Sequence, residues 1–337
     1  YGFTRVLEVE GGMSCARTGH RTGEPSGPYT SYLAEHGLFD DYVEDFVGRW
    51  EKGWIIGASH DSVLPLEHHQ DEFVGSKAVE RIESQEDDYP FYMFVNFQGP
   101  HDPFDPPTEI AERYRDAGMP EPIPTSFTGR PERIRGRHSD YAHATEQDVT
   151  KARRQYCAKI ELIDRQVGRI LNAMEQRGFL ENTIVVFASD HGEHLGDHGL
   201  FQKHTAYEPS MRVPMIVAGP GVQQGETDAM VELSDLNPTL VEMADLPAQP
   251  NLDAKSFSAV LTGEQAEHRD GCVTCEGVYR ALRTRRHKLI QTSGFNELYD
   301  LEADPTEQHN IAPEAPDLVK ELSRKINARF VEGRWHR

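Results

Sequence analysis

The stretch from residue 148 to residue 189 constrains the fold more than any other part of the chain. Apolar residues recur at helical spacing over residues 148–177, which predicts a long amphipathic helix that ends at Gly178. An uninterrupted apolar run over residues 183–189 follows at once, and such a run is typical of a strand buried on both faces. A helix that leads directly into a buried strand favours a layered α/β domain.

Further strands and helices are predicted on either side of this stretch. The apolar run at residues 91–97 predicts a strand covered on both faces, as in a parallel sheet, and residues 213–218 predict another strand. Helical spacing of apolar residues predicts helices over residues 74–85 and 236–243, the second with Ser234 as its N-cap. Together these elements extend the layered α/β pattern.

The two ends of the chain differ from this pattern. Residues 1–70 are rich in Gly and Pro and are predicted to be irregular, with one short helix near residues 30–46. From about residue 250, short strand-like runs follow one another, at residues 272–276, 279–284, 288–292 and 297–301. An amphipathic helical segment at residues 318–330 ends the chain. We therefore expect an α/β domain over residues 1–250 and a C-terminal subdomain over residues 251–337, an antiparallel sheet with one helix.

Composition excludes several classes of partner. Among 337 residues, Asp and Glu outnumber Lys and Arg by 56 to 35, so the net charge is −21. A chain this acidic is expected to bind neither nucleic acid nor anionic membrane surfaces, and no apolar run is long enough for a membrane-spanning helix. Four cysteines are too few for a disulfide scaffold, and Cys272 and Cys275 are read as plain strand residues. The sequence does not decide between a cytoplasmic location and a periplasmic or secreted one, nor does it give the oligomeric state.

Polar side chains follow two of the predicted strands. His101 comes after the run at 91–97, and Asp190 and His191 come directly after the run at 183–189. Ligands of open α/β sheets bind beyond the strand ends, so we expect His101 and Asp190 at the same edge. A carboxylate buried there needs a cation, although a turn or helix-cap role fits Asp190 equally well. His191 beside it favours a metal, because the pair supplies adjacent oxygen and nitrogen ligands.

A second group of polar residues lies further along the same loop. Lys203 is either a solvent-exposed lysine or a clamp for an anion, and His204 beside it adds a second donor. The loop also carries His194 and His198, but the intervening glycines argue against a helix that would align the histidines on a zinc ion. An anionic substrate is therefore favoured over a zinc site.

Several ordered motifs resemble one known family. They are Gly-Pro-His-Asp-Pro-Phe at 99–104, the run 181–193 ending in Asp-His-Gly-Glu, Leu-Gly-Asp-His-Gly-Leu at 195–200, Tyr-Glu-Pro-Ser-Met-Arg-Val-Pro at 207–214, and Glu-Leu-Tyr-Asp-Leu at 297–301 with Asp304-Pro305. From about residue 70 to the C-terminus the chain resembles the sulfatases of the alkaline phosphatase superfamily. It is most similar to the bacterial arylsulfatase, choline-sulfatase and phosphonate monoester hydrolase branches.

The resemblance implies a layered α/β/α sulfatase-like domain with the small C-terminal subdomain, and a defined site. One divalent cation is expected beside a formylglycine formed from Cys or Ser; calcium is the expected ion, with Mn²⁺ or Mg²⁺ as alternatives. Asp190 and His191 match metal-ligand positions, although calcium prefers oxygen to a histidine nitrogen. His101 would bind a sulfate oxygen or protonate the leaving group. Lys203, with His204 as a second donor, would neutralise the anion.

The chain also departs from the family pattern. The family's Asp-Asp pair after an N-terminal strand is absent, as is its Cys-x-Pro-Ser-Arg or Ser-x-Pro-Ser-Arg nucleophile motif. The nearest segment, Cys15-Ala-Arg-Thr-Gly19, has Arg for Pro and Gly for Arg, so Cys15 is not assigned as the nucleophile. We expect the missing piece to lie before Tyr1, the chain to be an N-terminally truncated fragment, and the fragment to be inactive alone.

Three functions follow as hypotheses. The first is a metal-dependent sulfuric ester hydrolase acting on a small-molecule or carbohydrate sulfate ester. The second is a phosphodiesterase or phosphonate monoester hydrolase of the same superfamily. The third is a non-catalytic, degenerate binding protein. The retained His101, Lys203 and Asp190 argue against it. Asp190 is expected to be a buried charge, which a site without a function has no reason to keep.

Overall fold

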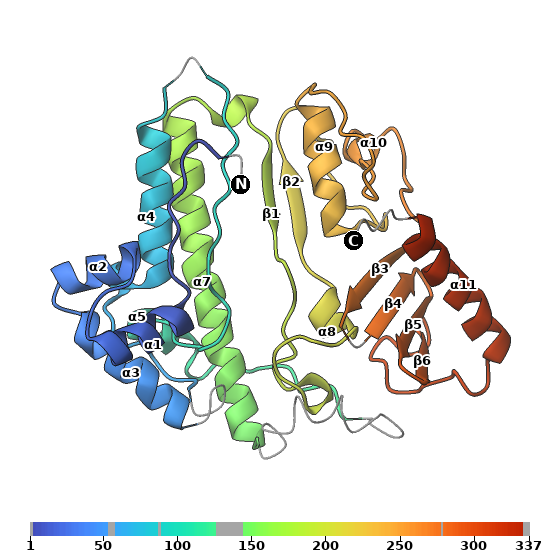
Figure 1. The fold of residues 1–337 in the computed structure, drawn as a ribbon, viewed down its shortest axis with the longest axis horizontal. Coiled ribbons are helices and arrows are strands. Elements are labelled where there is room, and N and C mark those ends of the chain that lie inside the picture. Colours follow the sequence, from blue (N-terminus) through green and yellow to red (C-terminus); the bar gives the residue numbers. More distant parts are fainter. Residues whose placement is uncertain (1–2, 53–57, 87–88, 126–143, 278, 333–337) are drawn as a thin grey trace. The chain divides into compact units, whose positions relative to one another are not determined.

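The structure is a computed structural model that describes residues 3–52, 58–86, 89–125, 144–277 and 279–332 (Figure 1). The chain divides into two compact units. The first unit comprises Tyr1–Glu121 with His143–Glu181, and the second comprises Pro122–Ala142 with Asn182–Arg337. The domain boundary expected at residue 250 stays a prediction.

The N-terminal part of the first unit is helical, so the prediction of an irregular segment was wrong. Its elements are α1 (Gly12–Thr22), α2 (Pro28–Glu35), α3 (Phe39–Glu51) and a 3₁₀ turn, η1 (Leu66–His68). The Gly and Pro residues mark helix ends rather than loops: Pro28 opens α2, and Gly23 closes α1 at φ +69°. The helices pack around the fully buried Tyr29 and Leu33.

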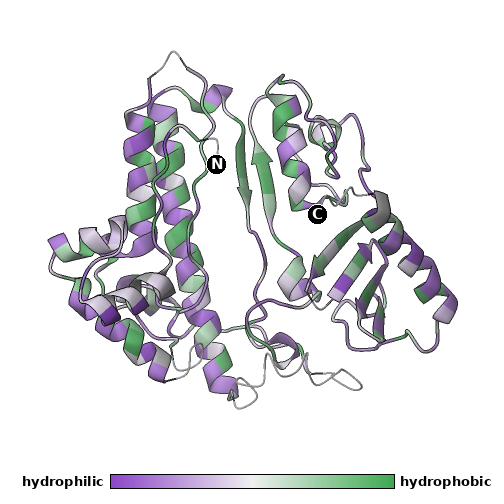
Figure 2. Ribbon diagram, in the orientation of Figure 1, coloured by the Kyte–Doolittle hydropathy of each residue, from purple (hydrophilic) through white to green (hydrophobic). Residues whose placement is uncertain are grey.

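Two long helices form the rest of this unit, as predicted. α4 (Gln70–Glu83) and α7 (Glu146–Gln176) run side by side, and Figure 2 shows hydrophobic and hydrophilic residues alternating along both. The Thr145 hydroxyl accepts the Asp148 N–H at 3.2 Å, and the Asp148 carboxylate accepts the Thr145 N–H at 2.9 Å, a reciprocal cap that starts α7. Short turns, α5 (Thr108–Ala111) and η2 (Glu112–Tyr114), lie between them in sequence. No helix in the described ranges is long and apolar enough to cross a membrane.

Residues 91–97 do not form the buried strand that their apolar run predicts. No strand among the described residues pairs with them, and the Tyr92 and Phe94 side chains are 64% and 69% exposed. An apolar run becomes a strand only where a neighbour completes its backbone hydrogen bonds. This prediction was therefore wrong for the structure as described.

The second unit begins with a short two-stranded sheet. After the turn η4 (Leu180–Asn182) comes β1 (Val185–Ala188), which pairs antiparallel with β2 (Met215–Ala218). Both strands lie where they were predicted, but the burial expected for residues 183–189 was wrong, since Phe187 is 40% exposed.

Short helical elements lie in the described loops of this unit, among them η5 (Asp197–Gly199), α8 (Glu208–Met211), α9 (Leu236–Met243) and α10 (Ser258–Leu261). α9 confirms the predicted helix. Its N-cap is Asp235 and not Ser234, because a 3₁₀ turn, η6 (Leu233–Asp235), leads into it.

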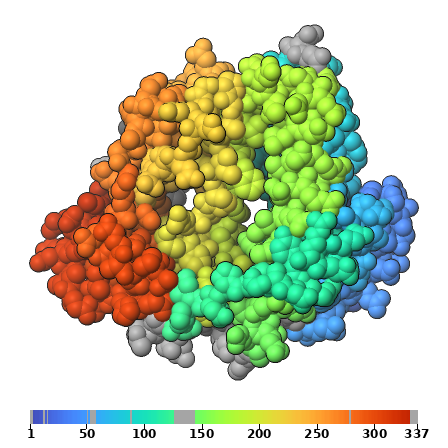
Figure 3. Space-filling view, turned by 180° about the vertical axis from the view of Figure 1, so that it is seen from behind, coloured from blue at the N-terminus to red at the C-terminus, as the bar shows by residue number. Residues whose placement is uncertain are grey.

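The C-terminal sheet and helix confirm the prediction from alternating strand-like runs. β3 (Gly271–Glu276), β4 (Tyr279–Thr284), β5 (His287–Thr292) and β6 (Phe295–Asp300) form one antiparallel sheet in that order, followed by α11 (Pro316–Glu332). In Figure 3 this part of the chain, coloured orange to red, forms one continuous surface. The chain thus combines mixed α/β content with a C-terminal antiparallel four-stranded sheet.

Successive residues of this sheet point to opposite faces, and each face has its own partner. Leu282, Leu289 and Leu298 pack against α11. Their neighbours Ala281, Ile290 and Tyr299 pack instead against residues 200–207, the segment that carries Lys203. One face of the sheet therefore supports the loop with the candidate anion-binding residues.

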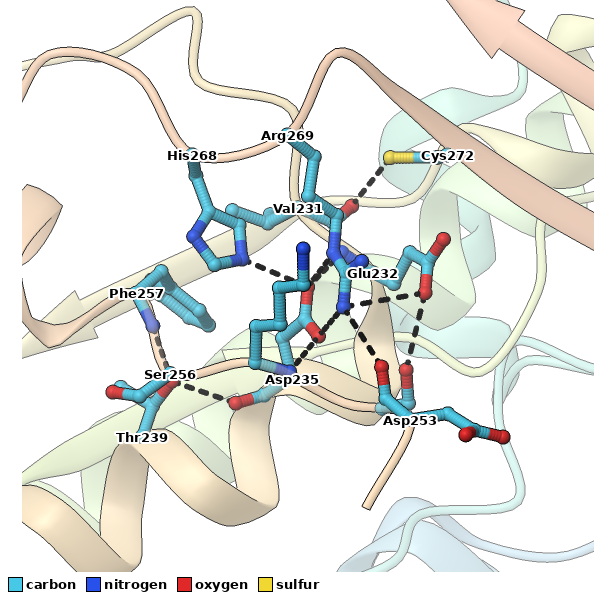
Figure 4. Close-up of polar contacts among 12 residues, drawn as sticks. Val231, Glu232, Asp235, Thr239, Asp253, Ser256, Phe257, His268, Arg269 and Cys272 are labelled. Atoms are coloured by element: carbon cyan, nitrogen blue, oxygen red, sulfur yellow. Dashed lines mark hydrogen bonds and ion pairs between the residues drawn. The ribbon is translucent and has the colours of Figure 1, made fainter. Parts of the chain in front are cut away.

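A buried carboxylate ties the start of α9 to the segment that enters β3. The Asp235 side chain is fully buried, and Arg269 donates to it twice, at 2.5 and 2.7 Å (Figure 4). His268 Nε2 lies 3.1 Å away, and the backbone N–H groups of Lys255 and Glu232 also donate to it. Burial alone would raise the Asp235 pKa, but these hydrogen bonds hold it below its usual value.

Asp235→Asn is expected to lower the free energy of unfolding at pH 7 by about 3–5 kcal/mol, because Arg269 loses the buried carboxylate that accepts two of its hydrogen bonds and keeps the longer ion pair with Glu232, at 3.7 Å. The folded-state pKa of Asp235 is lowered, so its contribution is present above the unfolded pKa of about 3.9 and is lost as the pH falls through the folded value. Urea unfolding at several pH values measures the difference between the two proteins.

Asp300→Asn is the control, because Asp300 forms an ion pair with the exposed Arg286 and little effect is expected. A difference between wild type and Asp235→Asn that stays constant from pH 7 to pH 3 would contradict this role of Asp235.

Candidate functional site

His101 lies in the first unit, on the irregular segment after residues 91–97. Its ring is about one-third exposed, and Nδ1 lies 2.9 Å from the Asp102 carbonyl oxygen and 3.1 Å from the Asp102 carboxylate. Carbonyl and carboxylate oxygens only accept, so Nδ1 carries a hydrogen. Nε2 is therefore the nitrogen at which this ring can exchange a proton with a bound molecule. Asp102, which was not singled out from the sequence, is buried and orients the ring.

The start of the His101 loop is fixed by α4. The Gly99 N–H donates to the buried Asp71 carboxylate at 3.1 Å, and a Cβ at Gly99 would lie 2.6 Å from an Asp71 oxygen. Asp71 is held in turn by the helix cap, since its N–H donates to His69 Nδ1 at 3.3 Å. His69 is itself buried.

Asp190 and His191 directly follow β1 in the second unit. The Asp190 side chain is 87% exposed, so the burial assumed for it was wrong and gives no argument for a compensating cation. His191 Nδ1 donates to the Gly192 carbonyl oxygen at 2.8 Å, which leaves the lone pair of the neutral ring on Nε2. Nε2 lies 3.7 Å from Asp190 Oδ2, so one cation can contact both atoms.

This pair supplies only part of a metal site. Within the ranges that the structure describes, no three His, Cys, Asp or Glu side chains are grouped to hold a metal ion. Calcium takes six to eight oxygen ligands, so the pair alone is insufficient. His101 lies in one unit and Asp190 in the other, and their meeting at one sheet edge stays a prediction.

The loop from Asp190 to His204 is held by its own polar groups. One Glu193 carboxylate oxygen accepts the N–H groups of Leu195 at 3.2 Å and Gln202 at 2.5 Å. Gln202 and His204 both adopt left-handed backbone conformations, at φ 65° and 80°. Lys203 lies between them, and such conformations outside glycine concentrate at functional sites.

His204 is directed toward the C-terminal sheet. Its Nδ1 lies 2.6 Å from Glu276 Oε1 on β3. A protonated His204 would therefore share its charge between this carboxylate and any anion bound at Lys203, which makes Lys203 the principal anion-binding candidate of the pair.

His194 and His198 are part of the packed interior beneath this loop. Both are buried, and the His198 ring stacks on Tyr207 with centroids 4.4 Å apart. His194 Nε2 is 2.8 Å from the Thr205 hydroxyl. The Tyr207 hydroxyl donates to the buried Glu297 of β6 at 2.5 Å, which anchors the loop to the sheet.

A buried ion cluster makes the second anchor. The fully buried Lys288 of β5 lies 2.6 Å from Glu208 and 2.8 Å from Glu307. Glu307 also accepts the Glu208 N–H at 2.8 Å. Burial would raise the pKa of Glu208, but Lys288 holds it below its usual value, whereas burial raises the pKa of Glu307. Lys288 and Glu307 were not identified from the sequence.

Lys288→Met is expected to destabilise the protein by about 3–5 kcal/mol, because two carboxylates would stay buried without their shared cation. Urea unfolding at pH 7 measures this. Arg286→Met on the same sheet removes an exposed ion pair and serves as the control, with little change expected. Equal stability of the Lys288→Met and Arg286→Met variants would show that the cluster does not hold the sheet and the loop together.

Comparison with known proteins adds to this geometry. The family model described as Sulfatase matches residues 19–246, and the model of the N-sulphoglucosamine sulphohydrolase C-terminal region matches residues 196–332. An arylsulfatase of Clostridium perfringens is 30% identical over 282 residues, which cover 79% of this chain and 58% of that protein. A choline-sulfatase of Rhizobium meliloti is 29% identical over 307 residues, which cover 83% and 59%.

The fold is also shared with a solved structure. The phosphonate monoester hydrolase of Agrobacterium radiobacter superposes with a TM-score of 0.74 over 90% of this chain and 69% of that one, at 22% identity. The chain spans less than two thirds of the length of the arylsulfatase and the choline-sulfatase.

Proposed function

The chain belongs to the sulfatase family, and from this we propose that the protein hydrolyses sulfate esters. The family match over residues 19–246 carries the proposal, because that range contains His101, Asp190, His191 and Lys203. The geometry around each of these residues supports a role in such a reaction.

We assign the leaving-group proton to His101. When the bond between sulfur and the ester oxygen breaks, negative charge develops on that oxygen, and a proton from Nε2 neutralises it. The Asp102 carboxylate beside Nδ1 stabilises the charged ring before transfer. After transfer the neutral ring keeps its Nδ1 hydrogen and its orientation.

Lys203 neutralises the charge on the sulfate oxygens, and His204 is the second donor. On a chain with net charge −21, an anionic substrate needs a local cation. The left-handed residues on either side of Lys203 fix its backbone in advance, so little reorganisation is needed when charge develops.

The proposal includes two groups from outside the described chain. A formylglycine would supply the attacking hydroxyl, and a divalent cation, Ca²⁺ with Mn²⁺ or Mg²⁺ as alternatives, would add positive charge beside the sulfate. The exposed Asp190 carboxylate and the Nε2 lone pair of His191 would hold part of that cation's coordination shell.

The proposed substrate is a small-molecule or carbohydrate sulfate ester. Similarity to an arylsulfatase and a choline-sulfatase supports a small-molecule sulfate ester. The match to the N-sulphoglucosamine sulphohydrolase C-terminal model supports a carbohydrate sulfate ester. Hydrolysis of phosphonate monoesters or phosphodiesters is the second candidate, favoured by the likeness to a phosphonate monoester hydrolase. At 22% identity that likeness concerns the fold alone, so it ranks second.

Turnover of matched substrates tests the proposal. The full natural protein that carries this chain is assayed with an aryl sulfate, a glucosamine sulfate, an aryl phosphodiester and an aryl phosphonate. We expect kcat/KM to be highest for a sulfate ester, and His101→Gln to lower it roughly 10²–10⁴-fold, the usual contribution of a general acid. Preference for the phosphonate would favour the second candidate, and no turnover at all would favour a non-catalytic binding protein.

Metal binding tests the role of Asp190 separately. Asp190→Asn is expected to weaken binding of Ca²⁺, measured by calorimetry, roughly 10–100-fold or more, because a charged ligand is lost. Lys203→Ala is the control and should lower turnover without changing the metal content. Equal calcium affinity in wild type and Asp190→Asn would overturn the ligand assignment.

A further inference from the structure

The buried face of α7 carries a lysine. Lys159 is only 4% exposed and shares that face with Ala152, Ile163 and Gln166, which lie seven residues before and four and seven residues after it. An ammonium ion buried in this way is unfavourable by several kcal/mol unless acceptors surround it. The acceptors of the Lys159 ammonium therefore indicate its structural role.

All three hydrogens of the Lys159 ammonium have acceptors, and all the acceptors lie on the His101 segment. Nζ donates to the carbonyl oxygens of His101 and Pro103, both at 3.1 Å, and to the Asp105 carboxylate at 2.9 Å. The Lys159 side chain thus binds three alternate residues of one segment. One of them is His101, the candidate general acid.

Lys159 and Asp105 carry opposite charges at this contact. Burial would raise the pKa of Asp105, but Lys159 in the first place, then Arg49 and His69, hold it below its usual value, so Asp105 is ionised. His69 Nε2 lies 4.0 Å from Asp105 and Nδ1 lies 3.6 Å from Asp71, and burial lowers the pKa of His69, which favours its neutral form. Lys159 and Asp105 therefore form an ion pair at 2.9 Å, in an interior that also holds Asp71 and Arg49.

Polar and apolar side chains both line the underside of the loop. Lys159, Asp105, Asp71 and Gly99 line a cavity of about 20 Å³ there, a space close to that of one water molecule. The apolar anchor of the segment is Phe104, which packs edge-on against Tyr156 of α7 with ring centroids 5.6 Å apart. Phe104 can hold the segment near α7, but among the described residues of this helix only Lys159 bonds the backbone of His101.

We propose that Lys159 is a positioning residue that holds the backbone of His101 in its reactive orientation. The inference rests on the proposed function, in which Nε2 of His101 delivers the leaving-group proton. Asp102 orients the ring, Asp71 fixes the start of the loop, and Lys159 fixes the peptide from which the ring projects.

Two variants test this role, with one control. Lys159→Met keeps the length of the side chain but removes the donors, and Asp105→Asn removes the counter-charge if the first variant folds poorly. Arg153→Met is the matched control, because Arg153 is also a buried cation on α7 and donates to the carbonyl oxygen of Pro120, outside residues 98–106. All are made in the full natural protein.

The first readout does not depend on activity. Amide hydrogen exchange, followed by mass spectrometry, should speed up in peptides covering residues 98–106 by about tenfold or more in Lys159→Met, because a hydrogen bond to a charged group is lost. The peptides of β3–β6 should exchange as in wild type, and Arg153→Met should leave residues 98–106 unchanged. Unchanged exchange there in both Lys159→Met and Asp105→Asn overturns the inference, whatever the enzyme does.

The second readout separates positioning from general stability. With a sulfate ester, Lys159→Met should lower kcat roughly 10–100-fold with a smaller change in KM, as expected for a misplaced acid. Added to His101→Gln, it should lower kcat no further, since it acts through that ring. A full additional loss in the double variant would overturn the inference. Faster exchange in a protein without sulfate ester turnover would instead refute the proposed function and leave the loop contact established.

Discussion

Two buried ammonium groups hold the irregular segments that carry the candidate residues. Lys159 bonds the His101 segment to α7, and Lys288 bonds the loop that follows Lys203 to β5. Each has at least one carboxylate partner, because a buried charge without a partner would destabilise the fold. The hydrogen bonds of Lys159 fix a backbone that has no strand or helix of its own to fix it.

Local patterns predicted the elements whose burial is decided locally. The helical spacing in α4 and α7 and the alternation in β3–β6 were read correctly because each pattern records which face is covered. The run at 91–97 failed because burial on both faces depends on strands elsewhere in the chain. A short helix was expected near residues 30–46, where α2 and α3 lie, but α1 and the full extent of α2 and α3 were missed because their capping Gly and Pro residues resemble loop signals.

The candidate site residues show the same difference between features that local sequence determines and features that distant parts of the chain determine. Motif order identified His101, Asp190, His191 and Lys203, but it could not show that the Asp190 carboxylate is exposed, since exposure depends on the packing around β1. Lys159 left one visible signal, a lysine at a position where the helical period requires a buried side chain. Its acceptors lie more than fifty residues away in the sequence, at His101 and Asp105, and could not be inferred from the spacing.

The His101 segment and residues 200–207 are irregular, while several of the side chains that hold them come from regular elements. Asp71 and Lys159 project from α4 and α7, and Glu276 and Lys288 project from the C-terminal sheet. Helices and strands set the place of a side chain more closely than loops do, so a site gains precision when its supports are built this way. Reaction and support then reside on different residues, and each can be removed by substitution without removing the other.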